Sequence, residues 1–239
     1  MSNLCIIPAR GGSKRIPRKN IKDFLGKPIL AYSIEAALNS GLFEEVMVST
    51  DDEVIAKIAV QYGAKIPFER SKTNSDDYAT TMDVINEVLK DYTEKKGKEF
   101  RFVCCIYPTA PFIQISHLHE GFSKLISNNY TSVFPVVAFS YPVWRGLALD
   151  NKGASTMIWP EFLNARSQDL QPVYHDAGQW YWFNNENLKD WNWPENTGTL
   201  ILSEEHVQDI DTITDWKLAE IKFSLLKEKD LVIPNLNQT

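Results

Sequence analysis

The amino-acid sequence predicts an α/β fold, a mostly parallel sheet with helices on both faces. Short apolar runs alternate with amphipathic stretches of helical spacing along most of the chain. This alternation is typical of strands joined by crossover helices. The chain of 239 residues is also long enough to bury one full core, so we expect a single domain over residues 1–239.

The first elements follow from apolar runs and their spacing. Residues 4–8 form a short apolar run, which predicts a buried strand. Residues 29–40 have helical spacing, and one face of this helix carries Leu30, Ile34, Ala37 and Leu38. Gly41 follows as a C-cap, because glycine tolerates the left-handed conformation in which helices often end. Residues 45–49 predict the next strand.

The following stretch continues the alternation. Residues 52–62 predict a second helix, whose inward face carries Val54, Ile55, Ile58 and Ala59. Thr50 or Asp51 is suited to cap its start, because a short polar side chain there accepts a hydrogen bond from a free backbone amide. The remaining elements of this half are helices at 80–92 and 116–127 and strands at 102–107 and 132–137.

The alternation breaks after about residue 139. Residues 140–195 contain six of the seven tryptophans: Trp144, Trp159, Trp180, Trp182, Trp191 and Trp193. We predict a β-rich insertion here, with an aromatic strand at 179–183. The insertion packs on the main sheet, forms a sugar-binding and dimerisation arm, or does both, since aromatic side chains are enriched at interfaces and can face sugar rings. Strands at 199–203 and 207–210 and a helix at 214–226 close the chain.

Composition and charge exclude several classes of function. The formal net charge is −6, which disfavours nucleic acid or an anionic membrane as the main partner. No apolar run approaches the about 20 residues that a membrane span needs, and no signal peptide precedes the first predicted strand. Cys5, Cys104 and Cys105 lie in apolar, strand-like runs, an arrangement typical of reduced thiols in a cytoplasmic protein.

The loop after the first strand is the most informative part of the sequence. It contains two glycines and the five cations Arg10, Lys14, Arg15, Arg18 and Lys19. Glycines allow backbone amides to approach a ligand closely, and Arg and Lys neutralise negative charge. Because ligands of such sheets bind at the carboxyl ends of strands, we interpret the loop as a polyphosphate site. A solvated basic turn is the alternative.

A pair of carboxylates near the end of the chain is the second strong feature. Residues two apart in a strand point the same way, so Asp209 and Asp211, at the end of the strand expected at 207–210, would share one face, with Ile210 turned to the opposite face. Two carboxylates with open coordination positions suit Mg²⁺, which also takes water and phosphate oxygens. The alternative is structural, because Asp211 or Thr212 could cap the following helix.

Residues 7–20, IPARGGSKRIPRKN, resemble the N-terminal signature of the sugar-acid cytidylyltransferases, whose pattern is approximately I-P-A-R-G-G-S-K-x-I-P-x-K-N. The resemblance implies a Rossmann-like nucleotidyltransferase fold, a homodimer, and CTP and a sugar acid as substrates. The nucleotide-binding residues that it implies are Ala9, Arg10, Gly11, Gly12, Ser13, Lys14, Lys19, Asn20, Arg70, Asp77 and Thr80. In the family, an aspartate pair before the last helix binds the catalytic metal, a role that falls here to Asp209 and Asp211.

Two segments bear on the identity of the sugar. Residues 107–112, YPTAPF, stand where sialic acid synthetases usually have Gln-Pro-Thr-Ser-Pro-Leu-Arg. Together with residues 175–182, HDAGQWYW, they look more like the pseudaminate branch. The sugar-binding residues that this resemblance implies are Tyr107, Thr109, His175, Asp176 and Gln179. For residues 175–179, a glycine turn before an aromatic strand is the alternative interpretation.

The predicted reaction is transfer of CMP from CTP to the anomeric hydroxyl of a nine-carbon sugar acid, best matched by pseudaminic acid, with release of pyrophosphate. Arg10, Lys19 and Asp211 would be the catalytic residues and Mg²⁺ the cofactor, because the barrier is mainly one of charge and positioning. N-acetylneuraminate, legionaminate and 3-deoxy-manno-octulosonate are the alternative sugars. A non-catalytic nucleotide-binding module is the alternative of another class, and it would leave the aspartate pair without a role.

Overall fold

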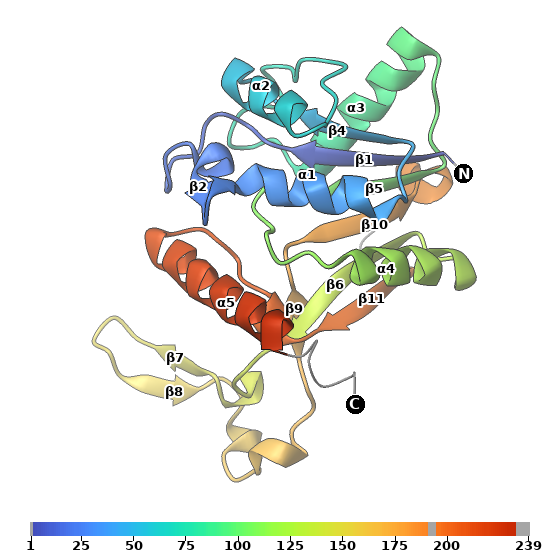
Figure 1. Cartoon of the computed structure of the whole chain (residues 1–239). Helices are drawn as coiled ribbons and strands as arrows, with labels where there is room; N and C mark the ends of the chain where they lie inside the picture. Colours follow the sequence, from blue (N-terminus) through green and yellow to red (C-terminus); the bar gives the residue numbers. More distant parts are fainter. Residues whose placement is uncertain (1, 191–194, 233–239) are drawn as a thin grey trace, which may run out of the picture.

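The structure is a computed structural model that describes residues 2–190 and 195–232 (Figure 1). Its centre is a seven-stranded sheet in the order β11-β6-β10-β5-β1-β4, with β9 paired to β6. The strands are β1 (Asn3–Pro8), β4 (Glu45–Ser49), β5 (Phe102–Ile106), β6 (Ser132–Ala138), β9 (Tyr174–Asp176), β10 (Trp180–Asn184) and β11 (Thr197–Leu202). Two hairpins lie outside this sheet, formed by β2 (Asp23–Phe24) with β3 (Lys27–Pro28) and by β7 (Leu147–Leu149) with β8 (Ser155–Met157).

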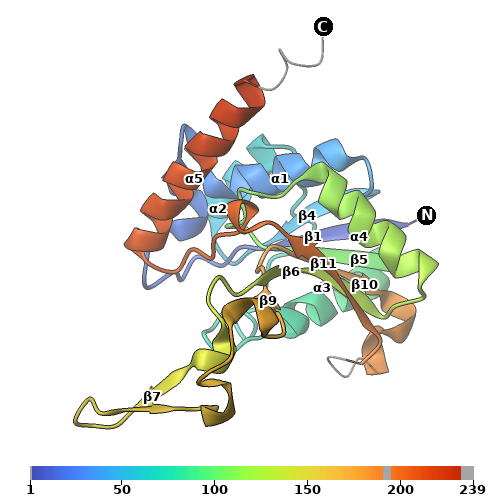
Figure 2. The same cartoon turned by 90° about the horizontal axis from the view of Figure 1, so that it is seen from below.

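Helices cover both faces of the sheet, as the sequence predicts (Figure 2). They are α1 (Ile29–Ser40), α2 (Glu53–Gln61), α3 (Thr81–Lys96), α4 (Ile115–Ser127) and α5 (Ile213–Val232). Helices α1, α2 and α4 contribute to the core on one face, and α3 contributes to the core on the other. None of the helices in the described ranges combines the length and the apolar character that crossing a membrane requires.

β10 is the element whose place the sequence did not reveal. It lies between β5 and β6 and is antiparallel to both, whereas β1 is parallel to β4 and β5, and β6 to β11. Trp180 and Trp182 belong to the core on one face, and Phe183 belongs to the core on the other. A strand buried on both faces has a continuous apolar sequence, so the aromatic segment expected in an insertion is a central strand.

The part of the expected insertion that leaves the sheet is an arm, residues 140–173, which contains the β7–β8 hairpin (Figures 1 and 2). The arm has a small cluster of its own, in which the ring of Trp144 lies 5.5 Å from that of Trp159 and 5.4 Å from that of Phe162. Trp191 and Trp193, also assigned to the insertion, lie outside the described residues.

Most predicted boundaries agree with the structure to within a few residues, and the exceptions have simple causes. No strand forms at residues 207–210, which run in an irregular segment before α5. Leu38 and Val54, expected on inward helix faces, are exposed. The buried face of α2 is narrower than predicted, because only Ile55 and Ala59, one turn apart, reach the core.

The three cysteines fit the expectation of reduced thiols. Cys5, Cys104 and Cys105 are free and buried in the sheet. Burial raises the pKa of each thiol well above its ordinary value, because a thiolate loses its hydration inside the core. These cysteines are therefore packing residues with little nucleophilic character.

A third apolar cluster, separate from the two cores of the sheet, joins segments that are distant in the sequence. Its buried members are Ile16, Phe24, Ile29, Phe112, Ile210, Trp216 and Ala219. Ile16 belongs to the loop after β1, Ile210 stands between the two aspartates, and Trp216 lies on α5. The cluster thus fixes the N-terminal loop and the aspartate segment against one helix, which positions the site described below.

Gly121 on α4 is a sensitive point of the packing against β10. A Cβ atom at Gly121 would lie 2.4 Å from Cη2 and 2.7 Å from Cζ3 of Trp180. Alanine is favoured over glycine within a helix by about 1 kcal/mol. We nevertheless expect Gly121→Ala to lower the free energy of unfolding by about 1–3 kcal/mol, because the overpacking outweighs the propensity.

Urea unfolding measures this effect, with Gly12→Ala as the control, since a Cβ at Gly12 would meet nothing within 4 Å. Equal unfolding midpoints for the two variants would contradict the close packing of α4 on Trp180.

Candidate active site

Three segments converge at the carboxyl edge of the sheet. The glycine loop, residues 9–20, follows β1, residues 107–109 follow β5, and the aspartate segment, residues 207–211, follows β11. The strands before them all run in the same direction, so their carboxyl ends meet at one edge. The Nζ atom of Lys19 donates a hydrogen bond of 2.6 Å to the Ile210 carbonyl, which joins the first segment to the last.

A cavity of about 650 Å³ opens at this edge. Its lining consists of Pro8, Arg10, Ser13, Lys14, Arg15, Ile16, Lys19, Asn20, Asp77, Tyr107, Pro108 and Thr109. Four of the five cations of the glycine loop therefore face one space, as a polyphosphate site requires. Two of the predicted sugar-binding residues, Tyr107 and Thr109, line the same space.

A second cavity of about 210 Å³ adjoins the first. Its lining consists of Pro8, Arg10, Arg70, Asn74, Asp76, Asp77, Ala79, Thr80, Thr81, Val84 and Tyr107. Arg10, Asp77 and Tyr107 belong to both linings, so they stand at the boundary between the cavities. The predicted nucleotide-binding residues Arg70, Asp77 and Thr80 are thus brought together with the glycine loop.

Arg10 and Lys14 share one carboxylate. Nη1 of Arg10 lies 2.9 Å from Oδ1 of Asp77, and Nζ of Lys14 contacts Oδ2 of the same side chain. Asp77 stands in the segment before α3, far from the glycine loop in sequence. The hydrogen bond from Lys14, and then the charges of both cations, hold the pKa of Asp77 below its ordinary value, so this carboxylate is ionised at neutral pH.

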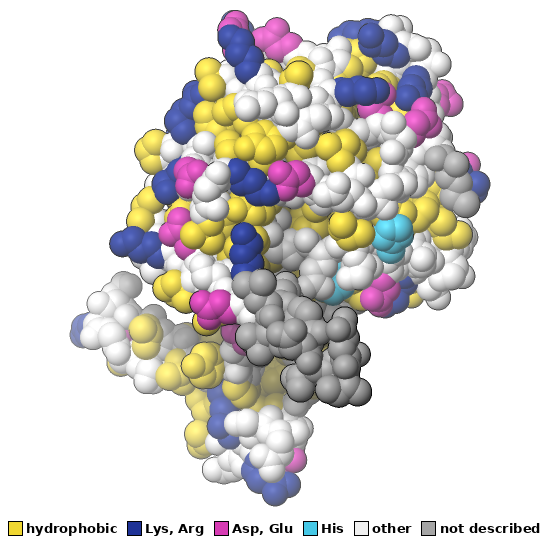
Figure 3. Space-filling view, in the orientation of Figure 1, with side chains coloured by type: hydrophobic (Ala, Val, Ile, Leu, Met, Phe, Trp, Pro, Cys, Tyr) yellow, Lys and Arg dark blue, Asp and Glu magenta, His cyan; other side chains and the backbone are white. Residues whose placement is uncertain are grey.

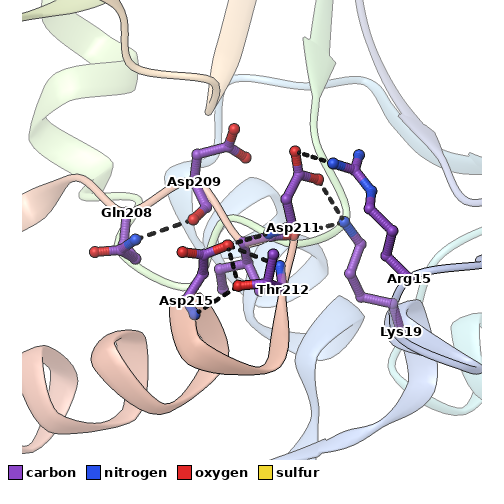
Figure 4. Close-up of polar contacts among 8 residues, drawn as sticks. Arg15, Lys19, Gln208, Asp209, Asp211, Thr212 and Asp215 are labelled. Atoms are coloured by element: carbon purple, nitrogen blue, oxygen red, sulfur yellow. Dashed lines mark hydrogen bonds and ion pairs between the residues drawn. The ribbon is translucent and has the colours of Figure 1, made fainter. Parts of the chain in front are cut away.

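Arg15 and Lys19 meet the aspartate segment (Figure 4). Nη1 of Arg15 lies 2.8 Å from Oδ2 of Asp211, and Nζ of Lys19 lies 3.6 Å from Oδ1. Figure 4 shows the Asp209 carboxylate beside Asp211 but outside this set of ion pairs. Ile210 is buried between them, so the expected placement of Ile210 away from the carboxylates holds although the strand does not form.

The start of α5 is capped by other residues, which leaves Asp211 available. The amide of Thr212 donates to the Asp215 carboxylate at 2.7 Å, and the amide of Asp215 donates to Oγ1 of Thr212 at 3.2 Å. This reciprocal arrangement is a capping box. Of the two residues that the structural alternative named, Thr212 is the cap and Asp211 turns its side chain to the cations.

The aspartate pair has the chemistry of a site for a hard cation. Burial raises the pKa of Asp209 and the adjacent Asp211 raises it further, although Lys19 acts in the opposite direction. A divalent cation would relieve this repulsion. No group of three or more His, Cys, Asp or Glu side chains within residues 2–190 and 195–232 is arranged to hold a metal ion. Two carboxylates fit Mg²⁺, whose remaining positions are commonly taken by water and substrate phosphates.

Aspartates from the start of α2 brace the rest of the glycine loop. Asp52 caps α2 by accepting hydrogen bonds from two backbone amides, and its Oδ2 atom also lies 2.7 Å from Nη1 of Arg18. Oδ1 of Asp51 accepts a hydrogen bond of 2.9 Å from the Gly11 amide. The cap is therefore Asp52, where the sequence suggested Thr50 or Asp51, because the helix begins one residue later than predicted.

These contacts limit which backbone groups of the loop can reach a phosphate. The Gly11 amide is bound to Asp51, and the Ser13 amide donates to the Gly11 carbonyl at 3.1 Å. The Gly12 amide has no hydrogen-bond partner among the described residues. Ala9 is fully buried and its amide donates to the Ser49 carbonyl at 2.9 Å. Among the predicted backbone contacts, Gly12 is thus the one with a free amide.

Arg70, Asn20 and Thr80 are held firmly by their own neighbours. Nε of Arg70 donates to Oγ of Ser49 at 3.0 Å and Nη2 donates to the Ser49 carbonyl at 2.6 Å. Asn20 is buried, and its Nδ2 donates to the Arg10 carbonyl at 2.9 Å. Thr80 caps α3 in a capping box with Asp83. These side chains are preorganised at the edge of the cavities.

Three of the predicted sugar-binding residues do not line either cavity. Gln179 is only 3% exposed, and its Nε2 donates to the His206 carbonyl at 2.5 Å. The Asp176 carboxylate accepts hydrogen bonds from the Tyr181 hydroxyl at 2.6 Å and from the Gly178 amide at 2.7 Å. His175 lies on β9, with its ring against Phe139. The alternative interpretation, a glycine turn before an aromatic strand, describes this segment as the structure has it.

Several residues of the site were not singled out as binding residues by the sequence. Arg15 lines the larger cavity and is paired with Asp211. Thr81 lines the smaller one, and its hydroxyl lies 3.1 Å from that of Tyr107. Arg15 was visible only as one of five loop cations, so it carried no signal of its own, whereas the sequence marked Thr81 only together with Thr80, as a small polar residue at a helix start.

Comparisons with known proteins agree with this geometry. A family model described as cytidylyltransferase matches residues 4–179. A pseudaminic acid cytidylyltransferase of Campylobacter jejuni is 43% identical over 230 residues, which cover 95% of this chain and 99% of that protein. A CMP-N,N'-diacetyllegionaminic acid synthase of Legionella pneumophila is 34% identical, with coverage of 95% and 99%.

A solved structure of similar fold is that of CMP:2-keto-3-deoxy-manno-octonic acid synthetase complexed with CTP. It superimposes with a TM-score of 0.68 at 18% identity, over 95% of this chain and 100% of that chain. This likeness bears on the fold alone, and it confirms the predicted α/β architecture.

The Asp52 carboxylate gives a pH-dependent prediction. Burial raises its pKa, but hydrogen bonds from the Ile55 and Val54 amides and from Arg18 outweigh burial, so the net pKa lies below the ordinary 3.8. A carboxyl group with a depressed pKa stabilises the fold above its unfolded pKa, and this stability is lost as pH falls through the folded value. We expect Asp52→Ala to lower the free energy of unfolding by about 1–2 kcal/mol at pH 7.

Chemical denaturation between pH 7 and pH values below 3.8 measures this loss, which should shrink as the wild-type carboxyl group is protonated. Asp52→Asn is the matched control, because asparagine keeps the cap and loses only the charge. A loss of equal size for both variants at pH 7 would contradict the capping role.

Proposed function

The chain belongs to the cytidylyltransferase family, and from this membership we propose that it transfers CMP from CTP to the anomeric hydroxyl of a nine-carbon sugar acid. The observation that carries the proposal is the meeting of the cationic glycine loop and the aspartate pair at one edge of the sheet. Pyrophosphate is the second product. Pseudaminic acid is the proposed sugar acid, because the relative at 43% identity carries that name.

The glycine loop serves the triphosphate in this proposal. Arg10, Lys14 and Lys19 line the larger cavity and would neutralise the charge that builds up on the leaving pyrophosphate. Preorganised cations of this kind contribute most where charge develops in the transition state. Lys19 is already oriented by its hydrogen bond to Ile210, so little reorganisation is needed when the phosphates enter.

The smaller cavity serves the nucleoside. Arg70 is fixed by two hydrogen bonds to Ser49 and retains donors for an acceptor edge such as O2 or N3 of cytosine. Thr80 and Thr81 line the same cavity and provide hydroxyl groups within reach of a ribose. Binding of the base here and of the triphosphate in the adjoining cavity would hold the α-phosphorus near their boundary, where Tyr107 stands.

The sugar acid would enter the larger cavity beside Tyr107 and Thr109. Tyr107 is oriented by its contact with Thr81 and by the ring of Tyr181, at 5.2 Å. Holding the two reactants in one orientation removes much of the entropic barrier of a bimolecular reaction. His175, Asp176 and Gln179 would not contact the sugar. They would support the site indirectly, by fixing the strand ends next to Tyr107 and Thr109.

Asp209 and Asp211 are the residues that would hold Mg²⁺. When bound there, the ion neutralises phosphate charge and lowers the pKa of an attacking hydroxyl. Asp211 would then give up its ion pairs with Arg15 and Lys19, and both cations would become available to phosphate oxygens. Asp211, which lines neither cavity itself, would in this way control how far Arg15 and Lys19 are available to a ligand in the larger cavity.

A homodimer is the proposed assembly, with the arm as a contact surface. Leu147, Leu149 and Leu163 on the arm are exposed, Leu149 by 70%. Figure 3 shows hydrophobic side chains on the part of the molecule that stands away from the sheet. Exposed apolar groups gathered on a projecting segment are typical of a protein interface.

The first test of the function is pyrophosphate release with CTP and Mg²⁺ against a panel of pseudaminate, legionaminate, N-acetylneuraminate and 3-deoxy-manno-octulosonate. We expect turnover with pseudaminate, dependent on both the sugar and the metal. Turnover with another member of the panel alone would keep the reaction and overturn the sugar. Absence of turnover with all four, with CTP still bound, would contradict the enzymatic proposal for this substrate class.

The role of the aspartate pair is tested by Asp211→Ala. We expect the rate of turnover to fall by about a hundredfold or more, while the affinity for CTP measured without metal does not fall, because Arg10 and Lys14 remain and Arg15 and Lys19 are released from a competing carboxylate. The control is Asp215→Asn, a charge change of the same size at a residue whose carboxylate accepts hydrogen bonds from the amides of Asp211 and Thr212, just before α5. Equal losses for both variants would assign Asp211 a structural role.

A further inference from the structure

Asp77 occupies the two cations that a triphosphate would need. We propose that Asp77 is a displaceable anion, which holds Arg10 and Lys14 before a triphosphate binds and competes with it for both. This inference rests on the proposed function, since it takes the glycine loop as the phosphate site. Both cations contact one carboxylate, at the boundary of the two cavities.

The segment that carries Asp77 is anchored to α3 both before and after residues 76 and 77, and Asn74 also donates a hydrogen bond of 2.5 Å to the Glu87 carboxylate. The Ser71 amide donates to the Glu87 carboxylate on α3 at 2.8 Å, and Thr80 caps the same helix. Between these anchors, the Asp76 carbonyl accepts a hydrogen bond of 2.5 Å from Arg10. Among the described residues, the hydrogen bonds and ion pairs between this segment and the glycine loop all join residues 76 and 77 to Arg10 and Lys14.

Local structure presents Asp77 to the cations without depending on them. The Asp76 carboxylate accepts hydrogen bonds from the Tyr78 amide at 2.8 Å and from the Ala79 amide at 2.9 Å. This Asx turn fixes the direction of the chain at residue 77. The Asp77 side chain itself makes no other hydrogen bond within residues 2–190 and 195–232, so its release would disrupt no helix or strand.

A comparison with Asp52 shows the difference between a permanent and a displaceable partner. Asp52 is 18% exposed, caps α2 and binds Arg18 in one arrangement. Asp77 is 41% exposed, caps nothing and stands in an irregular segment. Loss of the Asp52 contacts would unpair a helix end, whereas loss of the Asp77 contacts costs only two solvent-exposed ion pairs, which contribute little to stability.

A triphosphate has the advantage over Asp77 in charge and in number of acceptors. Each phosphate group offers several anionic oxygens, and charge-assisted hydrogen bonds to phosphate are among the strongest in proteins. The carboxylate of Asp77 offers two oxygens and one charge. When a triphosphate replaces Asp77 at Arg10 and Lys14, the segment that carries Asp77 would move away from the smaller cavity. After the reaction, return of Asp77 to the two cations would favour the departure of pyrophosphate.

The experiment is calorimetric titration of inorganic tripolyphosphate, without divalent cations, into the wild-type protein and into Asp77→Asn. We expect the variant to bind about threefold to tenfold more tightly, because the competing charge is gone. We also expect a steeper loss of affinity with salt, because cations no longer held by a carboxylate release solution anions when they bind phosphate. Glu94→Gln is the control, since it removes one charge from an exposed pair with Lys90.

The outcomes separate the inference from the function on which it rests. Equal affinity in Asp77→Asn and Glu94→Gln, or weaker affinity in Asp77→Asn, would overturn the role of Asp77. A gain that persists when Arg10 and Lys14 are both replaced by glutamine would also overturn it, because the competition must act through these two cations. Absence of tripolyphosphate binding to wild type and variant alike would overturn the phosphate site itself, and the inference with it.

Discussion

The structure depends on charge matching between one loop and aspartates from three other segments. Five cations follow β1 within a short stretch, and left alone they would repel one another. Each of the five is paired with Asp52, Asp77 or Asp211, and these three charges relieve most of the repulsion. These aspartates come from the start of α2, the segment before α3 and the segment before α5. The loop can therefore take its shape only when distant parts of the chain have reached their places, so the site forms together with the fold.

The central position of β10 also joins distant segments of the site, in this case from within the sheet. Its first end is fixed by Gln179, whose carbonyl accepts a hydrogen bond of 2.8 Å from the Tyr107 amide and whose side chain binds the His206 carbonyl. One buried residue thus connects the end of β5 with the segment that leads to the aspartates. These two hydrogen bonds fix the end of β5, next to the cavity residue Tyr107, and the segment that leads to the aspartates against the same buried residue.

The sequence predicted local structure well and distant contacts poorly, for a physical reason. Periodicity and caps are encoded within a few residues, so α1 and β4 agree with their predicted limits. The place of β10 depends on pairing with strands far away in the chain, which an aromatic run cannot specify. Likewise, the cations of the glycine loop were visible, but their partners, such as Asp52 for Arg18, lie at separations that no spacing rule reaches. The resemblance of residues 7–20 supplied the chemistry that periodicity could not.

Asp52, Asp77 and Asp211 differ in the number of other contacts that would be lost if each left its cations. This difference determines which of the three ion-pair groups a ligand can replace. Asp52 is bound into a helix cap, so Arg18 belongs to the scaffold. Asp211 lies beside Asp209, whose raised pKa reflects burial and this neighbouring charge. A bound metal ion would therefore replace Arg15 and Lys19 as the partner of Asp211. Asp77 has no partner in the described structure beyond the two loop cations. An anionic ligand would therefore displace the Asp77 carboxylate from these cations. A loop held by carboxylates of graded strength stays ordered before its ligand arrives, and it still gives up the cations that the ligand needs.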